Sequence, residues 1–169
     1  LDLSSNRIVY LEALARFQSG TYGLLSPLEF IPIAEKSKLI VPLGEKICAE
    51  ALEFLQALKG DGFEDLKISI NISALQFLQE GFVDMILSTI RRTHADPRDI
   101  CLEITESVLA SNFSAINETL GVLLAEGIQI ALDDFGTGYS SFARVHELNI
   151  SCLKIDKRFI DRMTTIGDE

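Results

Sequence analysis

The sequence contains no tryptophan, only two histidines and only three cysteines among its 169 residues. Cys48, Cys101 and Cys152 are odd in number, lie far apart and form no Cys-x-x-Cys pair. Each sits in an apolar stretch, so we expect small buried hydrophobic side chains. Unpaired cysteines of this kind are typical of a reducing cytoplasm.

Positive charge and long hydrophobic runs are also scarce. Lysine and arginine total 15 against 25 acidic residues, a net charge of −10. This balance argues against binding to duplex DNA or RNA, which basic patches drive. No apolar run approaches the ~18 residues of a membrane span, and no secretory signal opens the chain. We therefore expect a cytoplasmic protein, or the cytoplasmic part of a membrane-anchored one. A hydrophobic content of 47% excludes disorder.

Two kinds of apolar segment alternate along the chain. Those typical of strands cover residues 8–14, 67–72, 100–104, 128–133 and 152–155. Those typical of helices cover residues 27–34, 43–59, 83–92, 115–126 and 140–148. Near-continuous apolar strands separated by amphipathic helices predict an α/β fold with a parallel sheet covered by helices.

Polar side chains interrupt the predicted strands in or just past their carboxyl halves. These residues are Glu12, Asn71, Glu103, Asp133, Asp134 and Lys154. The carboxyl ends of parallel strands share one face, where βα folds build their sites. One charge in an apolar strand is compatible with a structural salt bridge, but several in register indicate a shared site.

Carboxylate and amide oxygens are hard ligands that suit Mg²⁺ or Mn²⁺ rather than zinc. Asp133 and Asp134 are adjacent and can serve two ions, one of them bridging. Two metal ions about 3.5–4 Å apart commonly hydrolyse phosphoesters, and Lys154 suits orienting the water or stabilising phosphate charge. The glycine-containing segment 135–141 fits either amides facing a phosphate or a plain strand-to-helix turn.

Together these residues resemble the EAL domain family of bacterial cyclic di-GMP phosphodiesterases. Glu12-Ala13-Leu14, followed by Arg16, resembles the motif that names the family. Further segments agree in order, at residues 27–35, 71–76, 102–107, 133–141 and 153–156. The resemblance covers essentially the whole chain.

The resemblance implies a modified TIM (βα)8 barrel with an antiparallel first strand, and hydrolysis of cyclic di-GMP to linear pGpG with two Mg²⁺ or Mn²⁺ ions. The implied metal ligands are Glu12, Asn71, Glu103 and Asp133, with Asp134 completing the second metal site. Further roles are implied for Lys154 (holding the attacking water), Asp156 (a lesser catalytic role), Arg16 (substrate phosphate) and Glu106 (steadying the loop after Asp134).

The resemblance also implies parts that the sequence does not show. A βα barrel usually needs about 250 residues, so residues 1–169 are expected to be a partial EAL domain with about strands 2–6. By the same resemblance, the first strand and the last two βα units are expected to be missing from it. One of those units carries the family's general-base glutamate, so the fragment alone is expected to be inactive. The resemblance further implies fused sensor or GGDEF domains and a homodimer near the loop after Asp134.

Other functions remain open on the sequence. The main alternative is a catalytically inactive receptor that binds cyclic di-GMP, although such members of the family usually lose metal ligands. A pure interaction module, or a metal-dependent phosphatase with another substrate, agrees less well with the order of the motifs.

Overall fold

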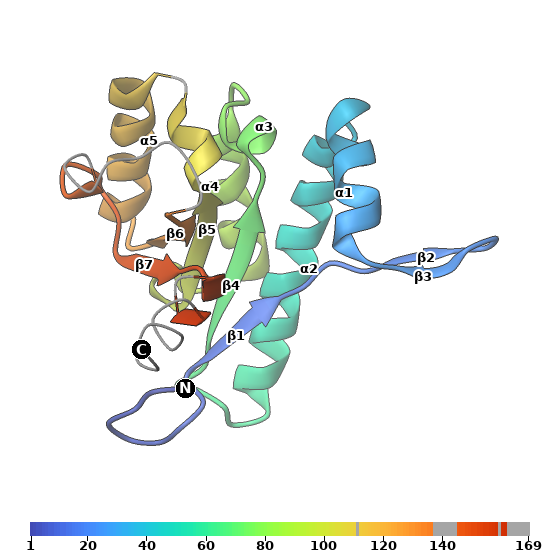
Figure 1. Ribbon diagram of the computed structural model, residues 1–169. Helices are drawn as coiled ribbons and strands as arrows, with labels where there is room; N and C mark the ends of the chain where they lie inside the picture. Colours follow the sequence, from blue (N-terminus) through green and yellow to red (C-terminus); the bar gives the residue numbers. More distant parts are fainter. Residues whose placement is uncertain (111, 137–144, 159, 162–169) are drawn as a thin grey trace, which may run out of the picture.

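The computed structural model describes residues 1–110, 112–136, 145–158 and 160–161. Strands and helices alternate along the chain (Figure 1). In chain order the elements are β1 (Tyr10–Ala13), β2 (Phe17–Ser19), β3 (Gly23–Leu25), α1 (Pro27–Lys36), α2 (Ile40–Gly60), β4 (Lys67–Ile72), α3 (Ala74–Phe77), α4 (Phe82–Thr93), η1 (Pro97–Asp99), β5 (Ile100–Thr105), η2 (Glu106–Ala110), α5 (Phe113–Ala125), β6 (Gln129–Phe135) and β7 (Cys152–Ile155).

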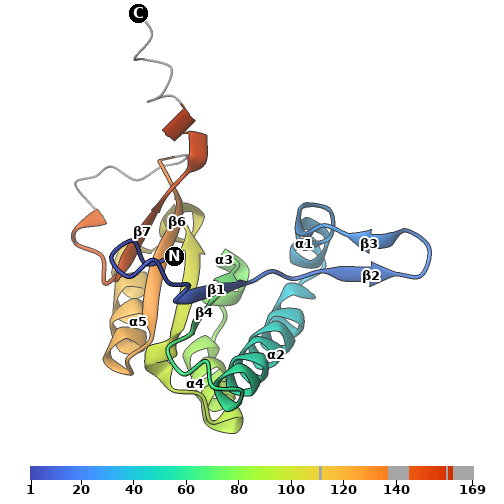
Figure 2. The ribbon, with the colours of Figure 1, turned by 90° about the horizontal axis from the view of Figure 1, so that it is seen from below.

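Five of the strands form one sheet, in the order β1-β4-β5-β6-β7, and every neighbouring pair is parallel. Figure 2 shows the sheet curled, with α2, α4 and α5 on one side of it. This is half of a βα barrel with its helices outside. The predicted fold class, a partial TIM barrel with parallel strands covered by helices, is confirmed.

The two faces of the sheet differ in chemistry because side chains alternate along a strand. Ile70, Ile104 and Leu132 belong to the buried core between the sheet and its helices. Asn71 and Glu103, each next to one of these residues, therefore face the concave side. The apolar periodicity thus places the polar residues of the strands inside the half-barrel.

A hairpin formed by β2 and β3 was not predicted. The two antiparallel strands have three residues each, too few for an alternating pattern, and Gly23 has a left-handed φ of 73°. Figures 1 and 2 show the hairpin projecting from the body beside α1. Helix α1 follows through a capping box, in which the Ser26 N–H donates to Glu29 Oε2 at 2.8 Å.

Three other expectations have different outcomes. Cys48 and Cys101 are buried, as predicted, but Cys152 is exposed because it lies on β7, the last strand of the sheet. The helix predicted over residues 140–148 falls largely outside the described residues. An antiparallel first strand is not tested, since residues 1–9 contain only an isolated antiparallel bridge between Asp2 and Arg7.

None of the helices in the described ranges is long and apolar enough for a membrane span.

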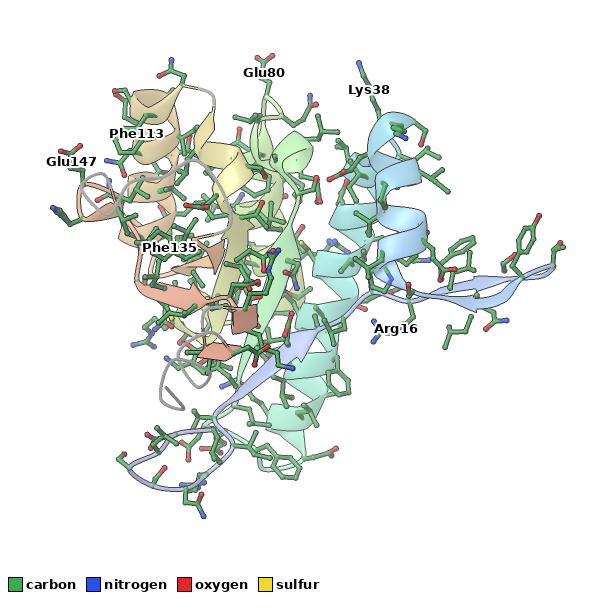
Figure 3. The ribbon with its side chains drawn as sticks, viewed as in Figure 1. Arg16, Lys38, Glu80, Phe113, Phe135 and Glu147 are labelled. Carbon is green, nitrogen blue, oxygen red and sulfur yellow. The ribbon has the colours of Figure 1, made fainter. Side chains whose placement is uncertain are left out.

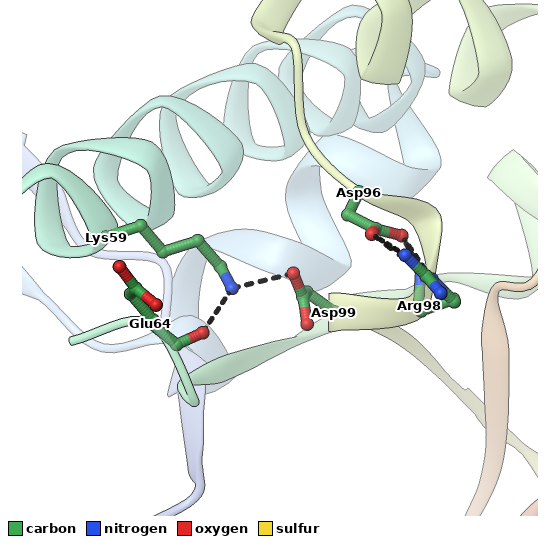
Figure 4. Close-up of polar contacts among 5 residues, drawn as sticks. All are labelled: Lys59, Glu64, Asp96, Arg98 and Asp99. Carbon is green, nitrogen blue, oxygen red and sulfur yellow. Dashed lines mark hydrogen bonds and ion pairs between the residues drawn. The ribbon is translucent and has the colours of Figure 1, made fainter. Parts of the chain in front are cut away.

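A polar cluster joins elements at the amino ends of β4 and β5 (Figure 4). Lys59, in the last turn of α2, lies with its Nζ 2.7 Å from Asp99 Oδ2 and donates to the Glu64 carbonyl at 2.6 Å. Nearby, Arg98 Nη2 and Asp96 Oδ2 are 2.6 Å apart. Lys59 thus ties α2 both to the loop before β4 and to the turn before β5.

Replacing Lys59 with methionine is expected to lower the free energy of unfolding by about 1 kcal/mol, because a largely shielded ion pair and a bond to a carbonyl are lost together. Lys46→Met is the matched control on the same helix, since its pair with Glu50 is exposed. The control is expected to cost less than about 0.5 kcal/mol. Urea denaturation measures both, and equal costs would contradict this role for Lys59.

Candidate functional site

The carboxyl half of the sheet brings together five of the predicted site residues. Glu12, Asn71, Glu103, Asp133 and Lys154 lie on β1, β4, β5, β6 and β7, the five successive strands of the sheet. Asn71 and Glu103 are direct partners in the register of β4 and β5. The hydrogen bonds among these side chains divide them into two groups.

Glu12 and Asn71 form the first group. The Asn71 Nδ2 donates a hydrogen bond to Glu12 Oε1 at 2.8 Å. The two residues lie on neighbouring parallel strands, and the amide orients the carboxylate without neutralising its charge. Glu12 and the Asn71 carbonyl oxygen therefore remain available as hard oxygen ligands.

Glu103, Asp133 and Lys154 form the second group. The Lys154 Nζ donates to Glu103 Oε2 at 2.6 Å and to Asp133 Oδ2 at 2.9 Å. The Glu103 side chain is only 5% exposed, against 23% for Asp133 and 33% for Lys154. Burial lowers the pKa of Lys154, but the hydrogen bonds and charges of Glu103 and Asp133 outweigh it, so the pKa is raised and the ammonium stays charged.

A β-bulge explains how Asp133 and Asp134 can both serve the site. Leu132 pairs with Leu153 and Phe135 pairs with Ile155, so the two aspartates together oppose only Lys154. Asp134 takes a left-handed φ of 53°, and its N–H donates to Asp133 Oδ1 at 2.8 Å. In a regular strand the two side chains would point to opposite faces.

Asp134 and Asp156 interact at the carboxyl ends of β6 and β7. Burial raises the pKa of Asp134, and the charges of Asp133 and Asp156 raise it further. The pKa of Asp156 is lowered, mainly because its Oδ1 accepts hydrogen bonds from Arg158 Nε at 2.9 Å and from the Arg158 N–H at 2.7 Å. Arg158 was not predicted, and an aspartate two residues before an arginine is too common a pattern to single it out.

A cavity of about 610 Å³ opens over this edge of the sheet. Glu12, Asn71 and Glu103 line it on one side, and the other side carries an apolar wall that includes Pro27 and Leu28. The volume lies in the range of about 300–1,000 Å³ typical of small-molecule sites. A single bound molecule in this cavity would therefore contact both the oxygen-bearing side chains and an apolar surface.

Arg16 lies apart from this cavity. It lines a neighbouring cavity of about 570 Å³, which shares Glu12 but contains neither Asn71 nor Glu103. Figure 3 shows Arg16 where β1 leads into the β2–β3 hairpin, and its Nη1 donates to the Ala15 carbonyl at 2.8 Å. A long guanidinium side chain at this place can still reach a ligand that extends past Glu12.

Glu106 is the most unusual of the predicted residues. It begins η2, directly after β5, and is only 4% exposed. Within the part of the chain that the structure describes, neither of its carboxylate oxygens has a hydrogen-bond partner. A buried acceptor without a partner is costly, so this carboxylate needs a donor.

Sequence reasoning assigned no role to Ser73, Gln76 or Gly44. The Ser73 N–H donates to Gln76 Oε1 at 3.2 Å, and the Gln76 N–H donates to Ser73 Oγ at 3.4 Å. This capping box starts α3 two residues after Asn71 and has a recognisable Ser-x-x-Gln pattern. Gly44 on α2 makes room for Gln76, and no sequence pattern indicates that contact.

The residues present fit a divalent metal by their chemistry. The donors are carboxylate and amide oxygens from adjacent strands, the set that Mg²⁺ and Mn²⁺ prefer. In the described ranges, however, no three His, Cys, Asp or Glu side chains already form a ligand cluster. Lys154 lies between Glu103 and Asp133, and Glu12 is hydrogen-bonded to Asn71.

The family model for the EAL domain matches residues 1–168. This chain belongs to the EAL domain family. Among its relatives, the bifunctional diguanylate cyclase/cyclic di-GMP phosphodiesterase MucR of Pseudomonas aeruginosa is 38% identical over 162 residues, which are 96% of this chain and 24% of MucR. The probable cyclic di-GMP phosphodiesterase PdeG of Escherichia coli is 37% identical over 153 residues, or 90% of this chain and 30% of PdeG.

Solved EAL structures agree with the fold. The MucR phosphodiesterase in complex with c-di-GMP matches with a TM-score of 0.88 and 39% identity, covering 94% of this chain and 64% of that one. The EAL enzyme Bd1971, bound to cAMP and cyclic di-GMP, matches with a TM-score of 0.85 and 33% identity, covering 95% and 45%. The chain spans between a quarter and a third of the length of the curated relatives MucR and PdeG.

Proposed function

We propose that the protein carrying this EAL chain hydrolyses cyclic di-GMP to linear pGpG by a two-metal mechanism. The observation that carries the proposal is the convergence of oxygen ligands and one lysine from five adjacent strands. Three of these residues, Glu12, Asn71 and Glu103, line a cavity of ligand size. MucR and PdeG, whose names describe cyclic di-GMP phosphodiesterases, support the substrate.

Glu12, Asn71, Glu103 and Asp133 would hold Mg²⁺ or Mn²⁺, and Asp134 would complete a second site. Bound divalent ions stabilise charge on the phosphate and lower the pKa of a bound water. The bulge that turns Asp134 beside Asp133 supports a second site, because it supplies two acids at one strand end.

The remaining residues have distinct roles in this proposal. Lys154 donates a hydrogen bond that orients the attacking water, Arg16 contacts a substrate phosphate beyond Glu12, and Asp156 orders the end of β7 next to Asp134. Glu106 steadies the loop after Asp134, a role that its buried carboxylate oxygens support. That loop includes residues 137–144, outside the described ranges, so its part in a homodimer stays a prediction.

The test is hydrolysis of cyclic di-GMP by the full-length protein with Mg²⁺ or Mn²⁺, with the linear product followed by chromatography. We expect pGpG to form only when the metal is present. Folded protein that binds the nucleotide without forming product would instead indicate a cyclic di-GMP receptor. Neither binding nor turnover would contradict both functions.

A further inference from the structure

The Lys154 ammonium lies between two carboxylates of the candidate metal site. Its Nζ is 2.6 Å from Glu103 Oε2 and 2.9 Å from Asp133 Oδ2. Glu103 is almost fully buried, and a buried carboxylate is stable only when a partner compensates its charge. Of the cations in the described residues, Lys154 is the one that forms an ion pair with Glu103.

The two groups of side chains therefore differ in the charge that lies next to their carboxylates. Glu12 is bonded to the neutral amide of Asn71, which repels no cation. Glu103 and Asp133 are bonded to a full positive charge, through one oxygen atom each. A divalent ion held by these two carboxylates would meet both the repulsion of the ammonium and its competition for the same oxygens.

We propose that Lys154 is a built-in counter-ion of the site, which competes with the divalent metal for Glu103 and Asp133. It stabilises the fold when metal is scarce and lowers the affinity of the site for metal. The proposal takes the metal site from the proposed function but does not depend on turnover.

The side chain of Lys154 suits this exchange. It is one-third exposed and lies on the last strand of the sheet, so solvent lies beside the ammonium. A lysine ammonium is a strongly hydrated point charge on a flexible stem. When a metal takes the two carboxylates, the ammonium can therefore turn into water and be hydrated there, while its backbone stays in β7.

The affinity for Mn²⁺ alone tests the proposal. Electron paramagnetic resonance of free Mn²⁺ gives the dissociation constant of the full-length protein in the absence of nucleotide. Lys154→Met is expected to bind Mn²⁺ roughly threefold to tenfold more tightly, since competition and repulsion are both removed. Lys154→Arg keeps a cation and is expected to bind no more tightly than the wild type.

Lys157→Met is the matched control. It removes the same charge three residues further along, from an exposed side chain, and is expected to change the Mn²⁺ affinity by less than about twofold because solvent screens it. If Lys157→Met tightened binding as much as Lys154→Met, long-range charge would explain the effect and the proposed competition would be wrong.

Thermal unfolding supplies a second readout. In a chelator, Lys154→Met is expected to unfold at a lower temperature than the wild type, because Glu103 and Asp133 lose their counter-ion. Saturating Mn²⁺ should reduce the difference in unfolding temperature between Lys154→Met and the wild type, because the metal then compensates the two carboxylates. Unchanged or weaker Mn²⁺ affinity in folded Lys154→Met, or no Mn²⁺ binding by any variant, would overturn the proposal. A wild type that does not hydrolyse cyclic di-GMP but shows the expected shifts would overturn only the proposed function.

Discussion

Replacing Asp133 with asparagine is expected to lower the turnover of cyclic di-GMP by roughly 10²–10³-fold or more, as removal of a group that stabilises transition-state charge does. The change removes the charge that lies 2.9 Å from Lys154 but keeps the shape of the side chain. It also keeps an oxygen that can accept the N–H of Asp134. The bulge should therefore persist, and the loss should fall on metal binding and chemistry.

Steady-state kinetics over a range of Mn²⁺ concentrations measures this effect. Glu53→Gln, which removes an acid from the exposed side of α2, is the control and should keep the activity of the wild type. Circular dichroism shows whether Asp133→Asn remains folded. Turnover equal to that of the wild type in the Asp133 variant would contradict the two-metal mechanism.

Replacing Gly44 with alanine is expected to lower the free energy of unfolding by about 1–3 kcal/mol, the usual cost of overpacking. The new Cβ would lie 1.7 Å from Gln76 Nε2 and 2.5 Å from Gln76 Cδ. Gln76 is only 3% exposed, and its Oε1 accepts the N–H of Ser73. To move away it must leave the capping box that follows Asn71.

Gly60→Ala is the matched control because Gly60 ends the same helix and a Cβ there has no neighbour within 4 Å. Alanine favours helices by about 1 kcal/mol over glycine, so this variant should be neutral or slightly stabilised. In the double variant Gly44→Ala/Gln76→Ala the clash is absent. Its loss of unfolding free energy should therefore be smaller than the sum of the losses in the two single variants. Denaturant unfolding measures the whole cycle, and additive costs would show that Gly44 and Gln76 do not interact.

The positions of most strands and helices could be predicted from the sequence because the apolar pattern decides them. Residues 67–72 and 152–155 were predicted to be strands, and β4 and β7 have these bounds. The convergence of Glu12, Asn71 and Glu103 follows from the shared direction of parallel strands. Neither result needs knowledge of side-chain contacts.

The finer arrangement of the site could not be predicted in this way. The sequence places three carboxylates and an amide on neighbouring strands. It does not determine which of them Lys154 contacts, because side-chain rotamers and burial decide that. The bulge at Asp134 depends on how β6 pairs with β7, and local composition does not encode that register. Arg16 lines a second cavity because the chain turns into the hairpin directly after it, and no pattern predicted that hairpin.

The bulge in β6 has a consequence for how the fold accommodates a second acid. Leu132 and Phe135 both belong to the buried core, although three positions separate them and regular alternation would put them on opposite faces. The extra residue shifts the phase of the strand by one, which returns Phe135 to the core and keeps Asp134 out of it. Without Asp134, the order Leu132, Asp133, Phe135 would already alternate correctly. Asp134 therefore acts as a one-residue insertion into β6, and the strand can pack with or without it. The number of carboxylates at this edge of the sheet can change while the fold stays the same.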